Sequence, residues 1–425
     1  MKVLLSLATA GLFLFSGCGS DGGSSAFIQT QLTKEELGKQ LFNDKNISLT
    51  RNTSCATCHD PEHGFADARF SEDGADQNIF VHGAFSVGDD GVSLGGRNAP
   101  TAAYAQFSPE FHKQEDGSYK GGQFHDGRAA TLKIQAMGPP LDGAEMQMAD
   151  KNAVVDRLKE NPEYVKAFEN LYGSDIFDDI DASYEAMAEA IGKFEKTEEF
   201  APFDSKYDKL RECLDSGESD SVCEEEGGWS NAELAGRALF FSTNANCFSC
   251  HAENASTTSA TERTKELFTN FEYENIGTPR NVDAMDARAA LNLQDANATF
   301  RGLGGTVEAT DANYTAHLGK TKVPTLRNVA VTGPYMNNGV FAKLRTVLEF
   351  YDHMMGKGDH AINPETNQIW GSNDNNATIN HDLLDNGQSL SDTKIRNLEA
   401  FLRTLTDERY EHLLPELAPV GELGN

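Results

Sequence analysis

The sequence NTSCATCHDPEHGFAD, residues 52–67, has at its centre a pentad that begins with Cys55 and contains Cys58 and His59. Two thiols at this spacing can form thioether bonds with both vinyl groups of a haem, and the adjacent imidazole can bind the iron. A zinc site would need a second pair of ligands at matching spacing, and a thioredoxin-like dithiol needs no histidine. We therefore predict a covalently bound haem c here, with His59 as the proximal iron ligand.

The same pentad returns at Cys247, Cys250 and His251. With 7 Cys and 11 His in 425 residues, chance predicts only about 0.003 such pentads. Each copy follows a short stretch with apolar residues at helical spacing, EELGKQLF before the first and AELAGRALF before the second. The sequence thus predicts a second haem c, with His251 as its proximal ligand, and two related domains.

Further helical patterns cover residues 152–173, 182–200, 344–355 and 391–405, and no strand pattern is sustained. We therefore predict a mostly α fold with two cytochrome c-like domains, each with one covalently bound c-type haem, joined by helices and long loops. The expected order is a signal peptide at 1–17, a lipid-anchored flexible tether at 18–31, an N-terminal haem domain at 32–205, an acidic linker with a disulfide at 206–228, and a C-terminal haem domain with a tail at 229–425.

The N-terminus MKVLLSLATAGLFLFSGC has one lysine, an apolar run and small residues that end at Cys18. This pattern predicts a secretory signal, and it resembles a bacterial lipoprotein signal that would lipidate Cys18. Phe15 stands where such signals usually carry an aliphatic residue, which leaves the lipoprotein route open. We expect an exported protein of a Gram-negative bacterium, in the periplasm or at the outer membrane, with membrane contact only through the N-terminal lipid.

Export to an oxidising compartment predicts that Cys213 and Cys223, which flank the acidic stretch CLDSGESDSVC, form a disulfide; two free thiols are the alternative. The 36 basic and 66 acidic residues give a net charge of -30. This charge argues against nucleic acid or an anionic membrane surface as partners, because both would repel it. It suits a basic protein partner, or an acidic surface that only keeps the protein soluble.

Five stretches together resemble the bacterial di-haem cytochrome c peroxidase family, which includes the MauG-type enzymes. They are CATCHDPEHGFAD, GGRNAPT, QFHDGRAATLKIQAMGPPLDGAEM, NIGTPRN and KVPTLRNVAVTGPYMNNG. The resemblance covers residues 32–407. It implies that peroxide is cleaved at the N-terminal haem, and that the C-terminal haem stores or delivers an oxidising equivalent.

The same resemblance implies a set of functional residues around the first haem. It identifies Gln135 as a distal-pocket residue and Glu145 as the acid-base that moves a proton between the peroxide oxygens. The alternatives are a helix-surface glutamine and an exposed acid. The family's interhaem calcium site resembles Asn98, Thr332 and the carbonyl of Pro334, which suit a hard cation but could merely shape turns.

Several positions depart from the family pattern, and the first concerns the loop SVGDDGVSLGG. Family members that need reductive activation carry a histidine there, which closes the first iron. Here Asp89 and Asp90 stand near the expected place, and His82 lies upstream at a poor spacing. We therefore predict an open iron at the first haem, ready for peroxide without prior reduction.

Another departure concerns the distal ligand of the second iron. Where the family's peroxidases carry methionine, the helical stretch KLRTVLEFYDHMM has Tyr351, as MauG-type enzymes do. Met355 lies four residues further on the same helical face and is the alternative ligand. A phenolate favours highly oxidised iron, whereas a thioether favours ordinary electron delivery.

Two more family residues are replaced, the interhaem tryptophan by His125 and a later histidine by Asn337. His125 could instead hydrogen-bond a haem propionate.

The sequence therefore favours a peroxidase that reduces hydrogen peroxide to water at the N-terminal, peroxidatic haem. The C-terminal haem would relay electrons from a small cytochrome c or cupredoxin. A MauG-like enzyme that oxidises residues of a protein substrate is one alternative, and a non-catalytic di-haem electron-transfer protein is another. The family also predicts a calcium ion and allows a homodimer.

Overall fold

The computed structural model describes residues 31–69, 83–252, 265–293, 299–356, 358 and 360–417. From Leu32 onward the chain forms one compact unit. The predicted signal peptide, Cys18 with almost all of the tether, His82 and the end of the tail lie outside the described residues. Among the helices that are described, none is both long and apolar enough to cross a membrane.

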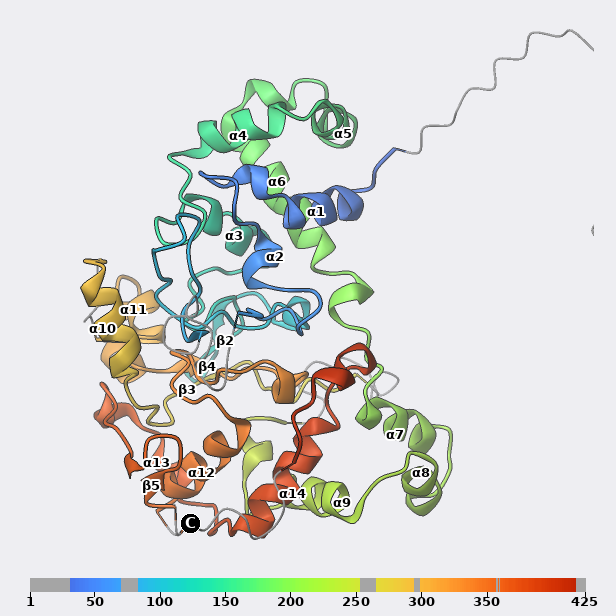
Figure 1. Ribbon diagram of the computed structural model, residues 1–425, viewed down its shortest axis with the longest axis vertical. Coiled ribbons are helices and arrows are strands. Elements are labelled where there is room, and N and C mark those ends of the chain that lie inside the picture. The colour runs from blue at the N-terminus through green and yellow to red at the C-terminus, as the bar shows by residue number, and fades with distance from the viewer. Residues whose placement is uncertain are drawn as a thin grey trace, which may run out of the picture. The chain divides into compact units, whose positions relative to one another are not determined.

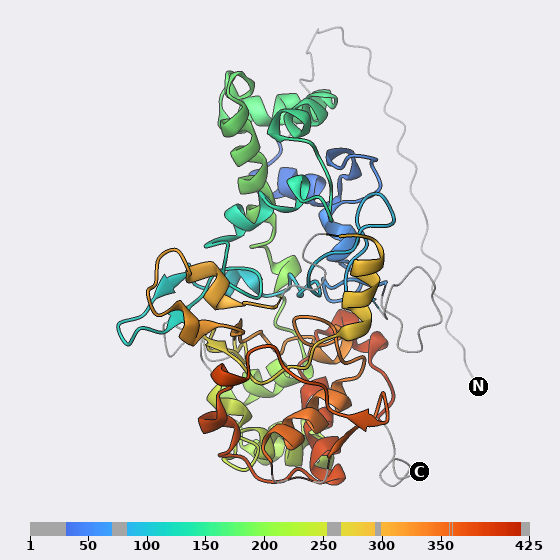
Figure 2. The same cartoon turned by 90° about the vertical axis from the view of Figure 1, so that its left-hand side faces the viewer.

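The described residues are mostly helical, which confirms the predicted class (Figures 1 and 2). The α-helices before the second pentad are α1 (Lys34–Asn43), α2 (Cys55–Cys58), α3 (Leu132–Ala136), α4 (Lys151–Lys159), α5 (Pro162–Tyr172), α6 (Ile180–Phe194), α7 (Lys206–Asp215), α8 (Asp220–Glu226) and α9 (Asn231–Phe240). Those after it are α10 (Val282–Ala290), α11 (Leu303–Val307), α12 (Leu344–Met354), α13 (His381–Leu384) and α14 (Asp392–Arg403).

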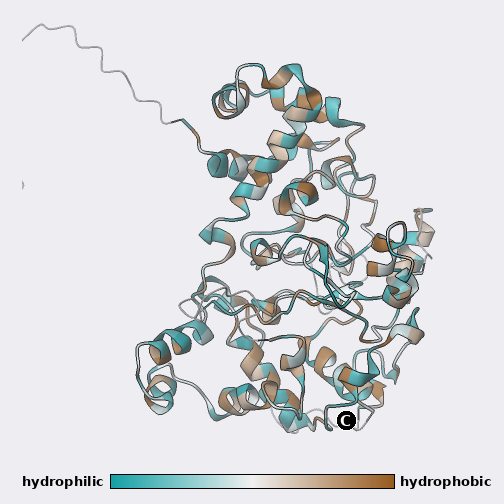
Figure 3. Cartoon of the chain, turned by 180° about the vertical axis from the view of Figure 1, so that it is seen from behind, coloured by the Kyte–Doolittle hydropathy of each residue, from teal (hydrophilic) through white to brown (hydrophobic). Residues whose placement is uncertain are grey.

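The strands are short and form three separate antiparallel pairs of two residues each. They are β1 (His112–Lys113) with β2 (Tyr119–Lys120), β3 (Tyr273–Glu274) with β4 (Thr321–Lys322), and β5 (Ile362–Asn363) with β6 (Gln368–Ile369). Figure 3 shows that the helices carry both hydrophobic and hydrophilic residues. The core is therefore built by helix packing, with long loops between the helices.

Two helix pairs, α1 with α6 and α9 with α14, repeat one packing arrangement (Figure 1). A Cβ added to Gly38 on α1 would lie 1.9 Å from the carbonyl oxygen of Ala190 on α6. A Cβ added to Gly236 on α9 would lie 1.8 Å from that of Asn397 on α14. The helices can approach this closely only because both crossing points lack a side chain. The internal repeat seen in the sequence is thus a repeat of three-dimensional packing.

The helical pattern at 152–173 forms two helices instead of one. Asn161 caps the second helix by accepting a hydrogen bond from the Glu163 backbone, and Pro162 is its first residue. Proline has no N–H to donate and fits the first turn, so it starts a helix here and cannot continue the preceding one.

The disulfide predicted between Cys213 and Cys223 is present and joins α7 to α8. Both helices lie within the segment 206–228 that was predicted as a linker, so this segment is largely helical. Its first helix also contributes Tyr207 and Leu210 to the hydrophobic core that contains α9 and α14. Residues 206–215 are thus part of the packing of the second half of the chain.

Candidate functional site

The first pentad forms the short helix α2, and His59 ends it. The Nδ1 atom of His59 lies 3.2 Å from the carbonyl oxygen of Phe65. Because a carbonyl oxygen can only accept, Nδ1 carries the proton and Nε2 keeps its lone pair. Burial lowers the pKa of His59, which also favours the neutral ring. The imidazole is thus held in the tautomer and orientation that a metal ligand needs.

The second pentad holds its histidine in the same way. The Nδ1 atom of His251 lies 2.8 Å from the carbonyl oxygen of Phe268, and burial lowers the pKa of the ring to about 4. Phe65 and Phe268 both adopt left-handed backbone conformations, with φ of 53° and 54°. These conformations are uncommon for a bulky residue, and here each accompanies a carbonyl that accepts from a histidine.

A pair of threonines completes the repeated frame around the histidines. The hydroxyl of Thr101 donates to Gly64 at 2.6 Å, and that of Thr325 donates to Leu267 at 2.8 Å. Each accepting carbonyl directly precedes the phenylalanine that holds a histidine. We call these two sets of hydrogen bonds the first and second histidine frames. The local sequences APT and VPT could have signalled this repeat.

The four pentad cysteines form no disulfide and are half-buried. Burial raises the pKa of Cys58, Cys247 and Cys250 to about 12 and that of Cys55 higher still. A thiol in such surroundings is a poor thiolate, so a redox-active dithiol does not fit either pentad. Thioether attachment of a haem requires only that the two cysteine sulfurs be suitably placed. Both pentads place them beside an oriented histidine.

A cavity of about 340 Å³ lies beside the second pentad. This volume falls in the range of small-molecule and cofactor sites. Its lining includes both cysteines and His251, together with the apolar side chains Leu344, Val347, Leu348, Leu398 and Leu402. A large, mostly apolar group attached at the pentad fits these walls.

Tyr351 and Met355 both line this cavity from the end of α12. Burial raises the pKa of Tyr351, and the nearby thiols of Cys250 and Cys247 raise it further, which places the phenol close to the pentad. The sulfur of Met355 packs against Gly387, where an added Cβ would lie only 2.0 Å from it. Tyr351 therefore faces the pentad, whereas the Met355 sulfur also fills a core position.

Near the first pentad, the side chain of Glu145 is half-buried. Burial and the charge of Asp142 raise the pKa of Glu145 to about 7, so that it can hold or release a proton near neutral pH. Its charge in turn raises the pKa of the thiols of Cys55 and Cys58, which shows that it lies close to the pentad. Gln135 lies half-buried on α3.

In the loop SVGDDGVSLGG, both aspartates form hydrogen bonds. Asp89 is buried and accepts hydrogen bonds from the Ser48 hydroxyl at 2.7 Å and from the Asn52 and Thr53 backbones at 2.9 Å. Asp90 accepts from Val92 and Ser93 within its own turn. Both carboxylates therefore shape the backbone, and Asp89 fixes the segment that leads into the first pentad.

The three residues predicted for calcium, Asn98, Thr332 and Pro334, line one and the same large cavity. His125 lines it too, and its Nε2 lies 3.0 Å from the backbone oxygen of Asn98. Burial lowers the pKa of His125 to about 4, so the ring is neutral and Nε2 donates to this carbonyl. His125 thus braces the loop that carries Asn98.

Lys322 on β4 was not singled out in the sequence, yet its ammonium group is buried at the cavity wall. It donates to the Ser108 hydroxyl at 3.3 Å and to the Gly122 carbonyl, and burial lowers its pKa to about 8. No carboxylate forms an ion pair with it within the part of the chain that the structure describes. A buried ammonium group is costly without an anion, and a haem carries two carboxylates, so the site fits that group.

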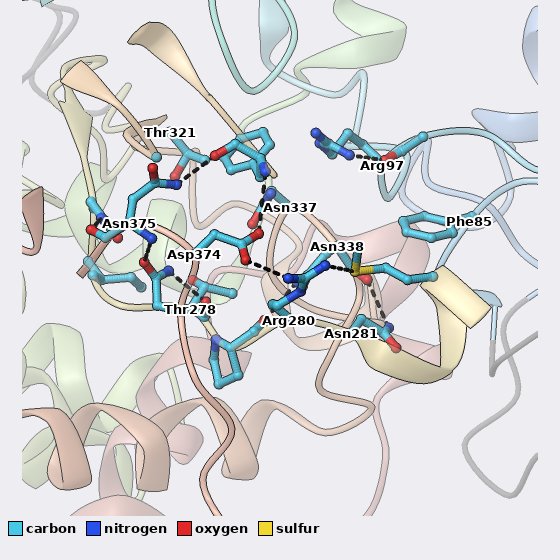
Figure 4. Close-up of a pocket in the computed structure, with 18 of the residues that line it drawn as sticks. Phe85, Arg97, Thr278, Arg280, Asn281, Thr321, Asn337, Asn338, Asp374 and Asn375 are labelled. Atoms are coloured by element: carbon cyan, nitrogen blue, oxygen red, sulfur yellow. Dashed lines mark hydrogen bonds and ion pairs between the residues drawn. The ribbon is translucent and has the colours of Figure 1, made fainter. Parts of the chain in front are cut away.

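A smaller cavity of about 60 Å³ adjoins the large one, and Figure 4 shows its polar lining. Arg280 pairs with Asp374 at 3.0 Å, and the Arg97 guanidinium lies 4.4 Å from the Phe300 ring centre. Asn337, which replaces a family histidine, lines both cavities. The smaller cavity is therefore rich in asparagine and arginine side chains.

Two cysteine pentads with oriented histidines, in a mostly helical chain with a repeated frame, define a di-haem c-type protein. A sequence model of the family described as "Di-haem cytochrome c peroxidase" matches residues 32–213. The chain is 43% identical over 381 residues to the methylamine utilization protein MauG of Paracoccus denitrificans. The aligned residues cover 89% of this chain and 90% of that protein. It is 27% identical to the cytochrome c peroxidase Ccp of Escherichia coli, over 73% of this chain and 51% of that protein.

Among solved structures, the diheme peroxidase BthA of Burkholderia thailandensis is similar, with a TM-score of 0.72 and 28% identity over 90% of this chain and 88% of that chain. The chain therefore belongs to the di-haem cytochrome c peroxidase and MauG family. Members of this family are cytochrome c peroxidases or MauG-type oxidoreductases, so the protein is a haem-containing oxidoreductase.

Proposed function

We propose that the protein is a MauG-like enzyme, in which peroxide reacts at the first haem and the electrons that reduce it are drawn from residues of a protein partner. The observation that carries this proposal is Tyr351, whose phenol lines the large cavity beside the second pentad. Similarity to MauG at 43% identity supports the same branch. A phenolate ligand stabilises ferric and more oxidised iron, which suits storage of an oxidising equivalent.

The chain's own residues supply proton handling and orientation. The haem groups, when bound, supply the redox chemistry. Glu145 would take a proton from one peroxide oxygen and return it to the departing oxygen, and Gln135 would orient the peroxide. His59 and His251, whose rings are fixed by the Phe65 and Phe268 carbonyls, would bind the two irons.

Electron paramagnetic resonance of the oxidised protein at low temperature tests this assignment. Tyr351→Phe should change the signal of the second haem and leave that of the first unaltered, because the phenolate is lost from one iron only. Met355→Leu is the matched control, since it also alters α12 at the cavity and should leave both signals unchanged. If Met355→Leu changed the signal of the second haem and Tyr351→Phe did not, Met355 would be the ligand and the protein would belong to the peroxidase branch.

The second candidate is a peroxidase that reduces hydrogen peroxide to water with electrons from a small cytochrome or cupredoxin. His125 favours it, because a buried neutral imidazole is much harder to oxidise than the tryptophan that it replaces. Steady peroxide-dependent oxidation of a reduced small cytochrome would support this candidate. Modification of a partner protein without such turnover would exclude it.

We further propose that each half of the chain, 32–205 and 229–425, carries one haem c, and that Asn98, Thr332 and the Pro334 carbonyl hold calcium. Their presence in the lining of the same cavity supports the latter. Export to the periplasm, a lipid on Cys18 and a homodimer belong to the same proposal. Mass spectrometry of the mature N-terminus and of bound metal tests the lipid and the calcium.

A further inference from the structure

A buried tyrosine and a buried aspartate meet between the two histidine frames. The side chains of Tyr104 and Asp407 are 1% and 0% exposed. The Tyr104 hydroxyl donates a hydrogen bond to Asp407 Oδ1 across 303 positions of sequence. Neither residue takes part in the proposed peroxide chemistry, so the pair calls for its own explanation.

Tyr104 is anchored in the first histidine frame. The Phe65 carbonyl that holds His59 also accepts the backbone N–H of Ala102 at 3.0 Å, two residues before Tyr104. The Tyr104 N–H donates to Phe200 at 2.9 Å. At the same time Tyr104 lines the large cavity beside the second pentad. The residue therefore connects the proximal side of the first haem site with the second site.

Asp407 is anchored in the second frame through Asn328. The Asn328 amide donates to Asp407 Oδ2 at 2.8 Å, and the Asp407 N–H donates to Asn328 Oδ1 at 2.8 Å. Asn328 follows Thr325 by three residues, as Tyr104 follows Thr101, and both have φ of 61°. Tyr104 and Asn328 thus occupy equivalent positions in the two frames and bind the same carboxylate.

This contact has the chemistry of a proton-coupled redox pair. A phenol that loses one electron becomes strongly acidic, so the loss is easy only where a nearby base takes the proton. The carboxylate of Asp407 is such a base. By contrast, the buried Tyr184 donates to the backbone carbonyl of Met137 at 2.7 Å, and a carbonyl is too weak a base for this role.

We propose that Tyr104 relays electrons between the two haem groups, with Asp407 as its proton acceptor. This inference rests on the proposed function, because hydrogen peroxide is the oxidant. One electron leaves Tyr104 for the haem that peroxide has oxidised, the phenolic O–H bond breaks, and an O–H bond forms on Asp407. An electron from the second haem then restores the phenol as the proton returns, so electrons and protons balance.

The relay should depend on pH through Asp407. Burial raises the pKa of Asp407 to about 6, and the hydrogen bonds from Tyr104 and Asn328 and the charge of Arg327 oppose that rise. The ionisable groups that face the pair from the packed elements are Arg327, Asp204, Asp208, Tyr410 and Tyr104 itself. Below about pH 6 Asp407 holds a proton and cannot accept another, so formation of the tyrosyl radical should fall there.

The test uses the holoprotein, mixed rapidly with hydrogen peroxide and frozen for electron paramagnetic resonance. We expect a radical signal that narrows when the protein is grown on ring-deuterated tyrosine. The signal should fall at least about tenfold in Tyr104→Phe and in Asp407→Asn. Tyr184→Phe is the matched control, because it removes a buried hydroxyl near the first pentad and should keep the signal.

The outcomes separate this inference from the proposed function. No change in haem absorbance on adding peroxide to the unaltered protein would contradict the proposed function. A normal haem response with an undiminished radical in Tyr104→Phe would overturn the relay alone. Should the variants lose their haem or fail to fold, the unaltered protein decides: a tyrosyl signal that does not fall between about pH 8 and pH 5 overturns the relay.

Discussion

Replacement of Glu145 by glutamine tests the acid-base step most directly. Burial and the charge of Asp142 raise the pKa of Glu145 to about 7. With that pKa, about a tenth of the molecules carry the ionised form at pH 6 and about nine tenths carry it at pH 8. Because the carboxylate must first accept a proton from peroxide, the rate constant of haem oxidation should rise about tenfold across this interval.

Glu145→Gln keeps the size of the side chain and removes its ability to carry a proton. We expect the rate constant with peroxide to fall about 10²- to 10⁴-fold, which corresponds to about 3–5 kcal/mol in the activation barrier. The pH dependence near 7 should vanish with it. Stopped-flow absorbance of the oxidised holoprotein under excess peroxide measures both quantities.

Asp142→Asn is the matched control. Asp142 is exposed, and its charge helps to raise the pKa of Glu145, so the variant should move the inflection to lower pH and keep the plateau rate. The reasoning would be refuted by a Glu145→Gln protein that reacts within about threefold of the unaltered protein and by a profile without an inflection.

Two further predictions concern the scaffold. Gly236→Ala should destabilise the folded protein by about 1–3 kcal/mol or more, because its Cβ would lie 1.8 Å from the Asn397 oxygen. In Gly143→Ala no atom lies within 4 Å of the added Cβ, so the free energy of unfolding should change by no more than about 0.5 kcal/mol. Thermal denaturation of both variants measures the difference. Asp208→Asn should cost about 3–5 kcal/mol, since it leaves the buried Arg327 guanidinium without its carboxylate. A loss below about 1 kcal/mol in urea denaturation would contradict that reading.

The features that the sequence predicted are those encoded over short spans. The pentads, the helices before them and the disulfide between Cys213 and Cys223 each lie within a few turns of chain, where spacing and periodicity determine structure. The break before Pro162 had a local signal as well, because asparagine followed by proline is typical of a helix start. The apolar residues at helical spacing on both sides of it nevertheless led to the prediction of one continuous helix.

The features that the sequence could not predict depend on contacts between distant segments. No local pattern indicates that the Lys322 ammonium is buried without a carboxylate partner in the described chain. The contact between Tyr104 and Asp407 spans 303 positions. Such pairs arise only after the helices pack, and a single sequence carries no record of which loops then meet.

The two halves keep one frame but differ in the side chains that surround it. Phe194 and Phe401 lie at equivalent places against Gly38 and Gly236, so the residues that follow them, Glu195 and Leu402, are equivalent too. Leu402 lines the large cavity beside the second pentad, whereas burial raises the pKa of Glu195 to about 8.

This difference bears on the roles of the two sites. Glu195 is protonated at neutral pH, it lies near Cys55, and one of its carboxyl oxygens has no hydrogen-bond partner among the described residues. With Glu145 it makes the first half the place where protons can be held and moved. The second half offers apolar walls and the phenol of Tyr351 instead, which suits the transfer of electrons. A repeated scaffold can thus acquire two distinct sites through a few buried ionisable residues.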